Sequence, residues 1–359
     1  MGIFSLEALQ AQQGDCLLIH FGPEDAPRFV VVDGGPGTAI HDRVLGPRLG
    51  ELRERWAPSG TLQLPLVVCS HIDNDHIGGL IRLVERSAAS EAVSVESLWH
   101  NSFRRLAPSA PERELRAALA ASPLTASVPQ GDRLYAAADE AAIAVNQGFD
   151  EDLVLAPAGG TAVREVGQLK LTVLGPDRRA LDALRRKWEA TRGLGPIGEA
   201  IAGNDDESIE NLSSIVFLAE SGRHTMLLTG DARGDYILDG LRRAGRLGRR
   251  GVDLDILKVQ HHGSSHSNNA EFFRRVRARH YVISANGKYD NPDRPTLQAI
   301  VDARGPAGYT IWLTNRGKSG TPLRRMLDRF AADNPEVRLS FRNERRPSLR
   351  IDLGGEVDY

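Results

Sequence analysis

Four side chains that commonly bind metal ions lie within six consecutive residues, His71-Ile-Asp-Asn-Asp-His76. Neutral imidazoles and carboxylates are good ligands for Zn²⁺, Mn²⁺ and Fe²⁺. The spacing allows His71 and Asp73 to face one ion, and Asp75 and His76 to face a second ion beside it. Two ions roughly 3.5–4 Å apart form a clamp that catalyses displacement at phosphorus or at a carbonyl carbon. The segment therefore predicts a two-metal hydrolytic site.

The elements around this segment favour the same interpretation. An apolar run over residues 64–69 predicts a buried strand that leads into it, and residues 78–88 predict a helix that follows it. A solvated surface loop would explain Asp75 or Asn74 as a helix cap. It would not explain two histidines and two aspartates directly behind a hydrophobic strand, so a cation site is the better interpretation.

Five motifs in order along the chain resemble the metallo-β-lactamase fold superfamily, whose hallmark is H-x-H-x-D-H. More narrowly, the chain resembles the soluble hydrolase domain of the DNA-uptake channel ComEC, in which the second histidine of the hallmark is also an aspartate. Besides the His71–His76 segment, the matching stretches are residues 14–19 with 29–35, 169–176, 211–218 with 226–231, and 256–264. Together they span about residues 12–300. The resemblance implies an α/β fold, a four-layer αββα metallo-β-lactamase sandwich.

The resemblance also extends the ligand set beyond the first four side chains. Asp231, at the end of the apolar run 226–230, would bridge both ions. His261 or His262 would complete the coordination of the second ion. The other histidine of this pair would hydrogen-bond the substrate or protonate the leaving group, and the sequence leaves that choice open.

Two places depart from the superfamily pattern. The third motif normally supplies a histidine after the middle strand, but this chain has Leu-Gly-Pro-Asp177 there, so Asp177 is a weak candidate ligand. His100 is the other candidate, as a ligand or a substrate contact, against the alternative of a hydrogen-bonded histidine at a strand end. The sequence Asp-Asn-Pro292 stands where the family often has His-Pro, which leaves the identity of the substrate open.

Further residues are expected around the metals. Asp33 would support the site without binding metal, by a hydrogen bond to the backbone or to a ligand histidine. Lys258, Ser264, His266 and Ser267 lie where phosphate contacts could form. Lys258 could equally be a strand residue that points to solvent.

The expected cofactor is a pair of divalent ions, Zn²⁺ or Mn²⁺, with Mg²⁺ or Fe²⁺ as alternatives. Asp73 replaces the usual second histidine and makes the ligand set richer in carboxylates. A harder ligand set favours Mn²⁺, Mg²⁺ or Fe²⁺ relative to Zn²⁺.

Composition and charge restrict the partners and the location that the protein is expected to have. The 359 residues carry a net charge of −2, so the whole molecule is no general polyanion binder. Arginine runs within residues 242–250 and 274–279 could form a basic rim for nucleic acid, or they could be solvated helix faces. No apolar run reaches about 18 residues, which predicts no membrane segment. Two cysteines in strand-like runs, and no signal peptide at the start, favour a cytoplasmic protein.

Alternating apolar runs and helical segments predict one α/β domain over residues 1–359. It would carry a helical insertion at 103–165, a second insertion at 178–210 and a C-terminal elaboration at 309–359. Strands are expected at 3–10, 15–21, 28–33, 64–69, 94–99, 169–176, 213–219, 224–230, 253–259, 280–285, 309–314, 337–342 and 347–353. Helices are expected at 40–56, 78–88, 111–121, 135–148, 178–191 and 320–333.

Three functions are compatible with these features. The leading hypothesis is a two-metal phosphodiesterase, a nuclease for DNA or RNA, in which a metal-bridging hydroxide oriented by Asp73 or Asp75 attacks phosphorus in line. The first alternative is hydrolysis of a small ester, thioester, lactone or phosphocholine headgroup, with the two insertions as a lid. The second is a non-catalytic, metal-holding module of a larger defence or DNA-processing complex.

Overall fold

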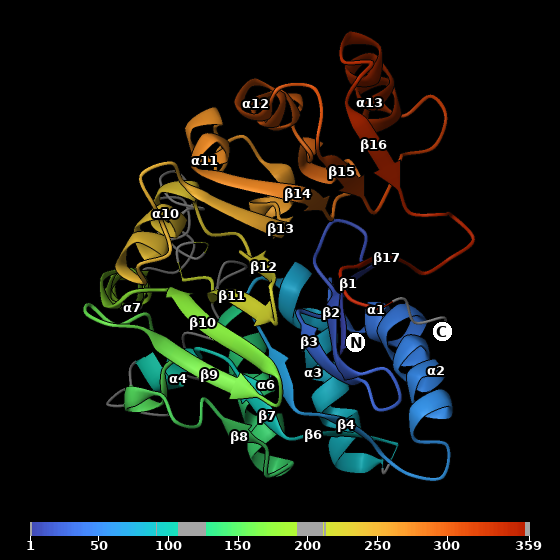
Figure 1. The fold of residues 1–359 in the computed structure, drawn as a ribbon. Helices are drawn as coiled ribbons and strands as arrows, with labels where there is room; N and C mark the ends of the chain where they lie inside the picture. Colours follow the sequence, from blue (N-terminus) through green and yellow to red (C-terminus); the bar gives the residue numbers. More distant parts are fainter. Residues whose placement is uncertain (1, 91, 107–126, 192–210, 212, 356–359) are drawn as a thin grey trace.

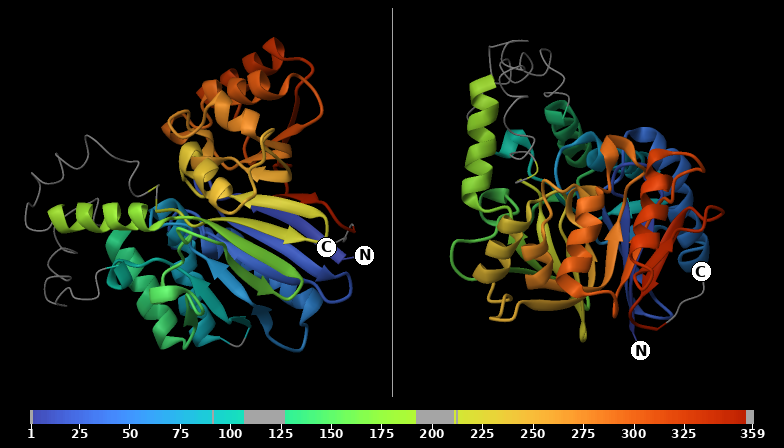
Figure 2. Two further views of the ribbon diagram at one scale, coloured as in Figure 1. Left: turned by 60° about the vertical axis from the view of Figure 1, so that its left-hand side comes forward. Right: turned by 90° about the horizontal axis from the view of Figure 1, so that it is seen from above.

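Two β-sheets pack face to face in the computed structural model, and helices cover the outer face of each sheet (Figure 1). The structure describes residues 2–90, 92–106, 127–191, 211 and 213–355. The left view of Figure 2 shows the layers in order: helices, sheet, sheet, helices. The expected four-layer αββα sandwich is therefore confirmed.

The first sheet has seven strands, six of them from the N-terminal part of the chain. Their spatial order is β17 (Ser348–Asp352), β1 (Gly2–Leu9), β2 (Leu17–Pro23), β3 (Arg28–Val32), β5 (Leu66–Val68), β7 (Ser97–Trp99) and β8 (Ala144–Val145). β1, β2 and β3 pair antiparallel, whereas β3, β5, β7 and β8 run parallel. The residues that follow β3 and β5 therefore meet at one edge of the sheet, where ligands bind in open α/β sheets.

The second sheet has eight strands. Their order is β16 (Arg338–Phe341), β15 (Thr310–Leu313), β14 (Val276–Ile283), β13 (Val252–Lys258), β12 (His224–Leu228), β11 (Val216–Ser221), β10 (Leu169–Gly175) and β9 (Ala162–Val166). β9 to β12 pair antiparallel, and β12 to β16 pair parallel. The carboxyl ends of β12, β13 and β14 consequently share one edge. A separate pair, β4 (Leu62–Leu64) and β6 (Val93–Val95), stands apart from both sheets.

Helices enclose the sheets on both sides (Figure 2). Those of the first half are α1 (Thr38–Ile40), the π-helical turn His41–Leu45, α2 (Gly46–Trp56), α3 (Asn74–Ala89), α4 (Phe103–Leu106), α6 (Ser127–Glu140) and α7 (Arg178–Thr191). Those of the second half are α10 (Gly234–Arg243), α11 (Ala270–Arg275), α12 (Arg294–Arg304) and α13 (Pro322–Asp333). Among the residues that the structure describes, no helix combines the length and the apolar character needed to cross a bilayer.

The period-2 pattern of the strands divides the apolar side chains between two cores. In β2, Leu17 and Ile19 pack in the core between the sheets, whereas Leu18 packs in the core beneath the helices. Successive side chains of a strand point to opposite faces, so a strand that is buried on both sides reads as a continuous apolar run. This explains why the strands were recognisable in the sequence without polar alternation.

Several element boundaries differ from the sequence-based expectations. Pro65 divides the expected strand 64–69, and Glu96 divides the expected strand 94–99, so each becomes two short strands. The helix expected at 135–148 is wrong in its second half, because α6 ends at Glu140 and residues 144–145 form β8. The helix expected at 111–121 lies outside the described residues.

The C-terminal segment contributes to both sheets. The expected helix over 320–333 and the strands near 309–314 and 337–342 are present, and β15 and β16 extend the second sheet. β17 instead pairs antiparallel with β1, with Leu349 opposite Ala8. β17 is therefore the edge strand of the first sheet, next to β1. The local sequence pattern does not reveal this pairing.

A buried charged network joins β1, β2, α2 and β17. Glu7, only 2% exposed, lies 2.9 Å from His20 and 2.9 Å from Arg48, and it accepts a hydrogen bond from Ser348. Burial alone would raise the pKa of Glu7, but the hydrogen bond and charge of His20 and the charge of Arg48 lower it from 4.5 to about 2. The ionised carboxylate is therefore stabilised by folding.

Replacing Glu7 with glutamine is expected to lower the free energy of unfolding at pH 7 by about 3–5 kcal/mol, because Arg48 loses a buried partner. In the wild type, the ionised Glu7 carboxylate contributes to the free energy of unfolding above pH 4.5. This contribution is lost as the pH falls towards 2, since the pKa of Glu7 is lower in the folded state than in the unfolded state. Denaturant titrations between pH 7 and pH 3 should show a smaller loss of stability for the variant. The exposed Glu54→Gln on α2 is the control, and equal pH profiles for wild type and Glu7→Gln would contradict the prediction.

Candidate metal centre

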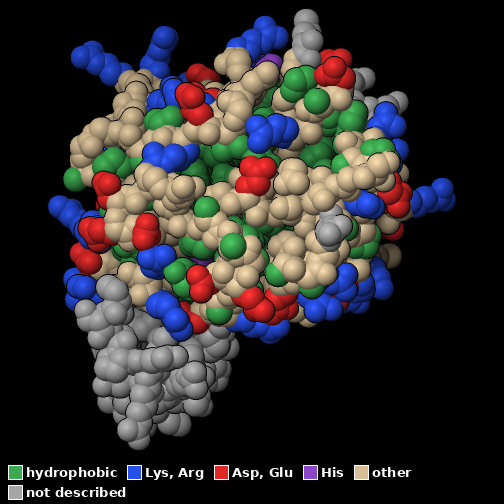
Figure 3. Space-filling view, turned by 90° about the horizontal axis from the view of Figure 1, so that it is seen from below, with side chains coloured by type: hydrophobic (Ala, Val, Ile, Leu, Met, Phe, Trp, Pro, Cys, Tyr) green, Lys and Arg blue, Asp and Glu red, His purple; other side chains and the backbone are tan. Residues whose placement is uncertain are grey.

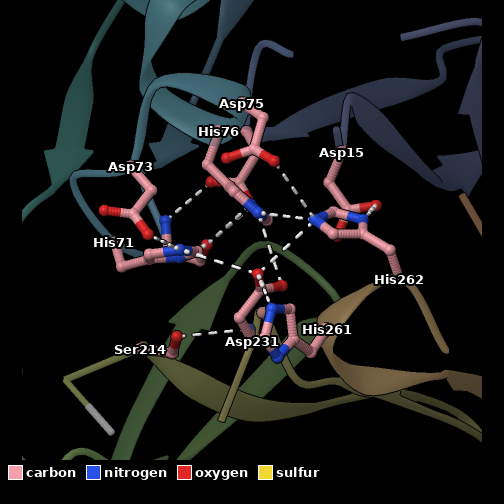
Figure 4. Close-up of polar contacts among 12 residues, drawn as sticks. Asp15, His71, Asp73, Asp75, His76, Ser214, Asp231, His261 and His262 are labelled. Carbon is pink, nitrogen blue, oxygen red and sulfur yellow. Dashed lines mark hydrogen bonds and ion pairs between the residues drawn. The ribbon is translucent and has the colours of Figure 1, made fainter. Parts of the chain in front are cut away.

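The His71–His76 segment joins a strand to a helix, as expected, but the helix begins earlier than the sequence suggested. β5 ends at Val68, and α3 begins at Asn74 with Asp73 as its N-cap residue. His71 and Asp73 therefore project from the loop, whereas Asp75 and His76 project from the first helical turn. This change of backbone conformation within six residues directs the two pairs of side chains differently (Figure 4).

Asp231 lies at the centre of the cluster (Figure 4). Its Oδ1 is 3.4 Å from Nε2 of His76, and its Oδ2 is 3.4 Å from Nε2 of His262, 3.8 Å from Nε2 of His71 and 3.9 Å from Nε2 of His261. Asp231 follows β12 and His261 and His262 follow β13, so the second sheet delivers these side chains to the edge where the first sheet delivers the loop. Asp231 thus has the central position expected of a bridging ligand.

The two adjacent histidines occupy different sides of the cluster. Nε2 of His262 lies 3.1 Å from Nε2 of His76 and 3.7 Å from Asp75, and its Nδ1 faces the backbone oxygen of Ser284 at 3.0 Å. His261 has a 21% exposed side chain and faces Asp231. The geometry therefore groups His262 with Asp75 and His76, and it leaves His261 nearer to solvent.

The backbone around the ligands is strained. Asp33, His261 and His262 have φ angles of 61°, 50° and 52°, in the left-handed region that non-glycine residues seldom adopt. Strain of this kind, on the order of 1–3 kcal/mol per residue, persists where the surrounding structure enforces it, and it clusters at functional sites. Three such residues in one site indicate that the fold maintains unfavourable backbone angles in order to hold these side chains in position.

Asp33 supports the site from behind, in the position that the sequence suggested. Its Oδ2 accepts from the hydroxyl of Ser70 at 2.7 Å and lies 2.8 Å from Nδ1 of His76. Its Oδ1 accepts from the backbone N–H of Ser70 at 2.7 Å. A carboxylate on Nδ1 orients the ring and leaves Nε2 of His76 directed towards Asp231.

Unsatisfied polar atoms show that the cluster suits cations. Among the described residues, Nε2 of His71, Oδ1 of Asp231 and Oδ1 of Asp15 are buried without a hydrogen-bond partner. Buried polar atoms are normally paired, so unpaired atoms on residues of one cluster could bind an ion or another ligand. Ligand atoms of Asp15, His76, Asp231 and His262 all lie within 4.8 Å of one another, and all four residues are buried. The residues present fit a divalent metal.

Electrostatics support the same conclusion. Burial would lower the pKa of His76, but the carboxylates of Asp231 and Asp33 raise it well above its ordinary value. Burial would raise the pKa of Asp231, but His262, His76 and His261 hold it well below. The pocket thus favours positive charge beside an ionised Asp231, and bound cations would take the place of protons on the histidines.

Sequence reasoning missed Asp15. It lies in the Gly-Asp-Cys stretch that marked the opening hairpin, where it was interpreted only as the start of a strand. Its 1% exposed carboxylate reaches the cluster from the turn between β1 and β2. A Gly-Asp pair before a strand was the available signal, but nothing local distinguishes it from a turn.

The structure shows partners away from the cluster for His100 and Asp177, and their roles as a ligand or a substrate contact stay predictions. Nε2 of His100 faces the backbone oxygen of Gly131 at 3.0 Å, and burial lowers the pKa of His100 to about 4. Asp177 instead accepts from the backbone N–H of Ala180 at the start of α7 and pairs with Arg243 at 3.1 Å. Both side chains therefore have local partners, although Nδ1 of His100 is buried without a hydrogen-bond partner among the described residues.

The proposed phosphate contacts are also revised. Lys258 is 1% exposed and pairs with Asp15 at 2.7 Å, so it neither points to solvent nor is free to meet a phosphate. Ser264 is buried, and its hydroxyl accepts from the backbone of its own turn. Ser267 is buried too, with its hydroxyl 3.0 Å from Nδ1 of His261. His266 is exposed and remains a predicted contact.

The arginine runs do not form a rim around the cluster. They lie near the starts of β13 and β14, which pair with Val252 opposite Val276, whereas the metal ligands follow the other end of β13. Seven residues of strand separate the two ends by roughly 20 Å. Arg243, Arg246 and Arg277 pair with acidic side chains. Basic and acidic side chains are likewise interspersed on the face shown in Figure 3.

Gly14 allows the turn before β2 to approach the metal loop. A Cβ atom on Gly14 would lie 1.9 Å from the backbone oxygen of Asp75, which also accepts from the N–H of Asp15 at 3.1 Å. We expect Gly14→Ala to lower the free energy of unfolding by about 1–3 kcal/mol through overpacking, and to weaken Mn²⁺ binding by displacing the loop. Thermal unfolding and Mn²⁺ titration measure both effects.

The matched control is Gly60→Ala, since a Cβ atom there would meet nothing within 4 Å. That change should alter stability by no more than about 0.5 kcal/mol. Equal Mn²⁺ affinity for Gly14→Ala and Gly60→Ala would show that the turn does not hold the loop in place.

Comparison with known proteins gives limited but consistent matches. No family model matches the chain. A 97-residue stretch, 26% of this chain, is 31% identical to ComE operon protein 3 of Bacillus subtilis (strain 168) and covers 12% of that protein. A 139-residue stretch, 38% of this chain, is 28% identical to Microtubule-associated protein 1A of Rattus norvegicus and covers 5% of it. The matched stretches thus span a small part of either relative.

Two solved structures resemble the chain over 98% of its length. One is the metallo-beta-lactamase fold protein YhfI from Bacillus subtilis, covered completely, with 12% identity and a TM-score of 0.40. The other is a CmlA beta-hydroxylase mutant, covered over 54%, with 12% identity and a TM-score of 0.40. Likeness at this level supports no conclusion by itself. The four-layer arrangement and the His/Asp cluster at the strand ends are features of the structure itself.

Proposed function

We propose that the protein is a two-metal phosphodiesterase that cleaves DNA or RNA. The fold and the buried cluster support the broader activity, metal-dependent hydrolysis. The observation that carries the narrower proposal is the ligand set: Asp73, Asp75 and Asp231 face the same pocket as the histidines. Carboxylate-rich sites suit the hard cations that commonly serve phosphoryl chemistry. The similarity of one stretch to ComE operon protein 3 agrees with the resemblance to the ComEC hydrolase domain that the sequence motifs carry.

Two divalent ions, when bound, would supply Lewis-acid activation of water and of the phosphoryl group. The side chains have separate tasks. Asp75 is 24% exposed, so it can orient the attacking water and accept its proton. His261 is 21% exposed on the other side of Asp231, and it can donate a proton to the leaving oxygen. Asp33 keeps His76 in one orientation through both steps.

A small-molecule hydrolase is the second candidate, and the position of the arginines favours it. The basic runs lie away from the cluster and are partly ion-paired, so they do not supply an electrostatic track for a long polyanion. A short phosphodiester, ester, thioester or phosphocholine headgroup would not need such a track. The experiment must therefore compare polymers with small substrates.

Purified protein loaded with Mn²⁺ would be assayed on single-stranded DNA, double-stranded DNA, RNA, bis(p-nitrophenyl) phosphate, a lactone, a thioester and a phosphocholine ester. We expect cleavage of at least one nucleic acid, with Asp75→Ala lowering the rate by about 10²–10⁴-fold through loss of proton transfer. The exposed Asp25→Asn on the β2–β3 turn is the control. Hydrolysis of small substrates alone would replace the proposal with the second candidate. Intact substrates throughout would indicate a non-catalytic module.

A further inference from the structure

Asp15 and Lys258 form an ion pair beneath the metal ligands. Oδ2 of Asp15 lies 2.7 Å from Nζ of Lys258, and each side chain is 1% exposed. The ammonium also donates to the backbone oxygen of Val259 at 2.9 Å. Asp15 belongs to the first half of the sandwich and Lys258 is the last residue of β13, so the pair joins the two sheets at the site.

Burying this ion pair costs desolvation free energy, which must be offset by other interactions. Removing two charges from water costs several kcal/mol per ion, and the attraction between them repays this only when other hydrogen bonds complete the arrangement. Lys258 is well satisfied, but Oδ1 of Asp15 has no hydrogen-bond partner among the described residues. A buried carboxylate oxygen that is left open in this way is a free ligand atom.

The carboxylate of Asp15 belongs to the candidate metal cluster. Asp15 offers a ligand atom within 4.8 Å of those of His76, Asp231 and His262, and its Oδ1 lies 3.8 Å from Nδ1 of His262. Figure 4 shows Asp15 beside His262, on the side of the cluster away from His71. Asp15 therefore approaches the same side as His76 and His262.

The backbone holds Asp15 in this position. Its N–H donates to the backbone oxygen of Asp75 at 3.1 Å, and the absence of a side chain at Gly14 permits that contact. The carboxylate is thus fixed at three points: by the backbone, by Lys258 and by the close packing around it. A preorganised oxygen loses little entropy on binding an ion.

We infer that Asp15 is a further metal ligand, which binds through Oδ1 the ion held by His76 and His262 while Lys258 holds Oδ2. This inference rests on the proposed two-metal site. Lys258 offsets the negative charge that Asp15 adds to a pocket already containing Asp75 and Asp231. The position explains why a lysine is buried beside cation ligands.

The test is Mn²⁺ titration of metal-free protein by calorimetry, with metal content measured after dialysis. Wild type should bind two ions. We expect Asp15→Asn to bind one ion as wild type does and the other more than about 100-fold more weakly, since removing a group that only supports a metal ligand costs about 10–100-fold. The control is Asp25→Asn, an exposed aspartate in the next turn of the chain, which should bind both ions normally.

The double variant Asp15→Asn/Lys258→Met removes the unpaired lysine that Asp15→Asn leaves behind. It should fold, as judged by thermal unfolding, and it should still bind the second ion weakly. Two ions bound with wild-type affinity by this variant would overturn the inference, because the carboxylate would then serve only the ion pair.

These results separate the inference from the proposed function. Wild type that binds two ions but cleaves no substrate would refute the phosphodiesterase and leave the titration of Asp15→Asn as the measure of the inference. Active wild type with unchanged metal binding in Asp15→Asn would refute the inference alone. Wild type that binds no ion would refute both.

Discussion

Asp231→Ala is expected to lose both metal ions and, with them, all measurable hydrolysis. Asp231 lies within 3.4–3.9 Å of four histidine nitrogens, which places it between the two halves of the cluster. Metal activation is worth several kcal/mol of transition-state stabilisation, so the rate should fall by at least about 10³-fold. The buried imidazoles of His71, His76 and His262 and the partly exposed imidazole of His261 would also lose the anion that they surround.

Metal content and hydrolysis rate measure this prediction together. Asp231→Asn keeps the size of the side chain and should behave similarly, since an amide is a weaker ligand without charge. The exposed Asp235→Ala on α10 is the control, because Asp235 pairs with the exposed Arg233 in the same region of the chain. Retention of two ions by Asp231→Ala would show that Asp231 is not the bridge.

Removal of the metal ions is expected to lower the melting temperature by about 10 °C. A ligand present at 1,000 times its dissociation constant stabilises the folded state by about 4 kcal/mol, and each kcal/mol shifts the midpoint by about 2–4 °C in a protein of this size. The physical reason lies in Nε2 of His71 and Oδ1 of Asp231. Both atoms are buried without a hydrogen-bond partner among the described residues, and a bound cation would satisfy them. Adding Mn²⁺ to chelated protein should restore the midpoint.

Calorimetry with and without chelator provides the measurement, and Asp231→Ala provides its control because its midpoint should not respond to chelator. Parallel additions of Mn²⁺, Mg²⁺, Fe²⁺ and Zn²⁺ test the effect of Asp73. Because Asp73 adds a carboxylate, Mn²⁺, Mg²⁺ and Fe²⁺ should restore more of the melting temperature, relative to Zn²⁺, than they do at sites rich in histidine. A wild-type midpoint that is indifferent to chelator would refute a structural contribution of the metals.

The arginine runs illustrate how sequence proximity misleads. Arg249 and Arg250 precede the His261–His262 pair by about a dozen positions, which suggested a basic rim around the metals. An intervening β-strand turns that separation into roughly 20 Å along one direction, so the two groups lie at opposite ends of β13. A helix or a turn of equal length would have brought them closer.

The sequence by itself determined the parts of this protein that depend on neighbouring residues. The apolar runs determined most strands, and the His71–His76 segment determined the principal candidate ligands, since a strand followed directly by a helix leaves these side chains close together. The resemblance to a known fold supplied Asp231 and the histidine pair. Their local context was sufficient because each follows the carboxyl end of a buried strand.

Only the tertiary structure decided the rest. Whether His261 or His262 belongs with Asp75 and His76 depends on left-handed backbone angles in a short turn. The roles of Asp15 and Lys258 depend on a contact between residues 243 positions apart, and the pairing of β17 with β1 joins the two ends of the chain. Such contacts carry no local signal, because they arise from the packing of two sheets against each other, and the residues that make them look ordinary until both sheets are in place.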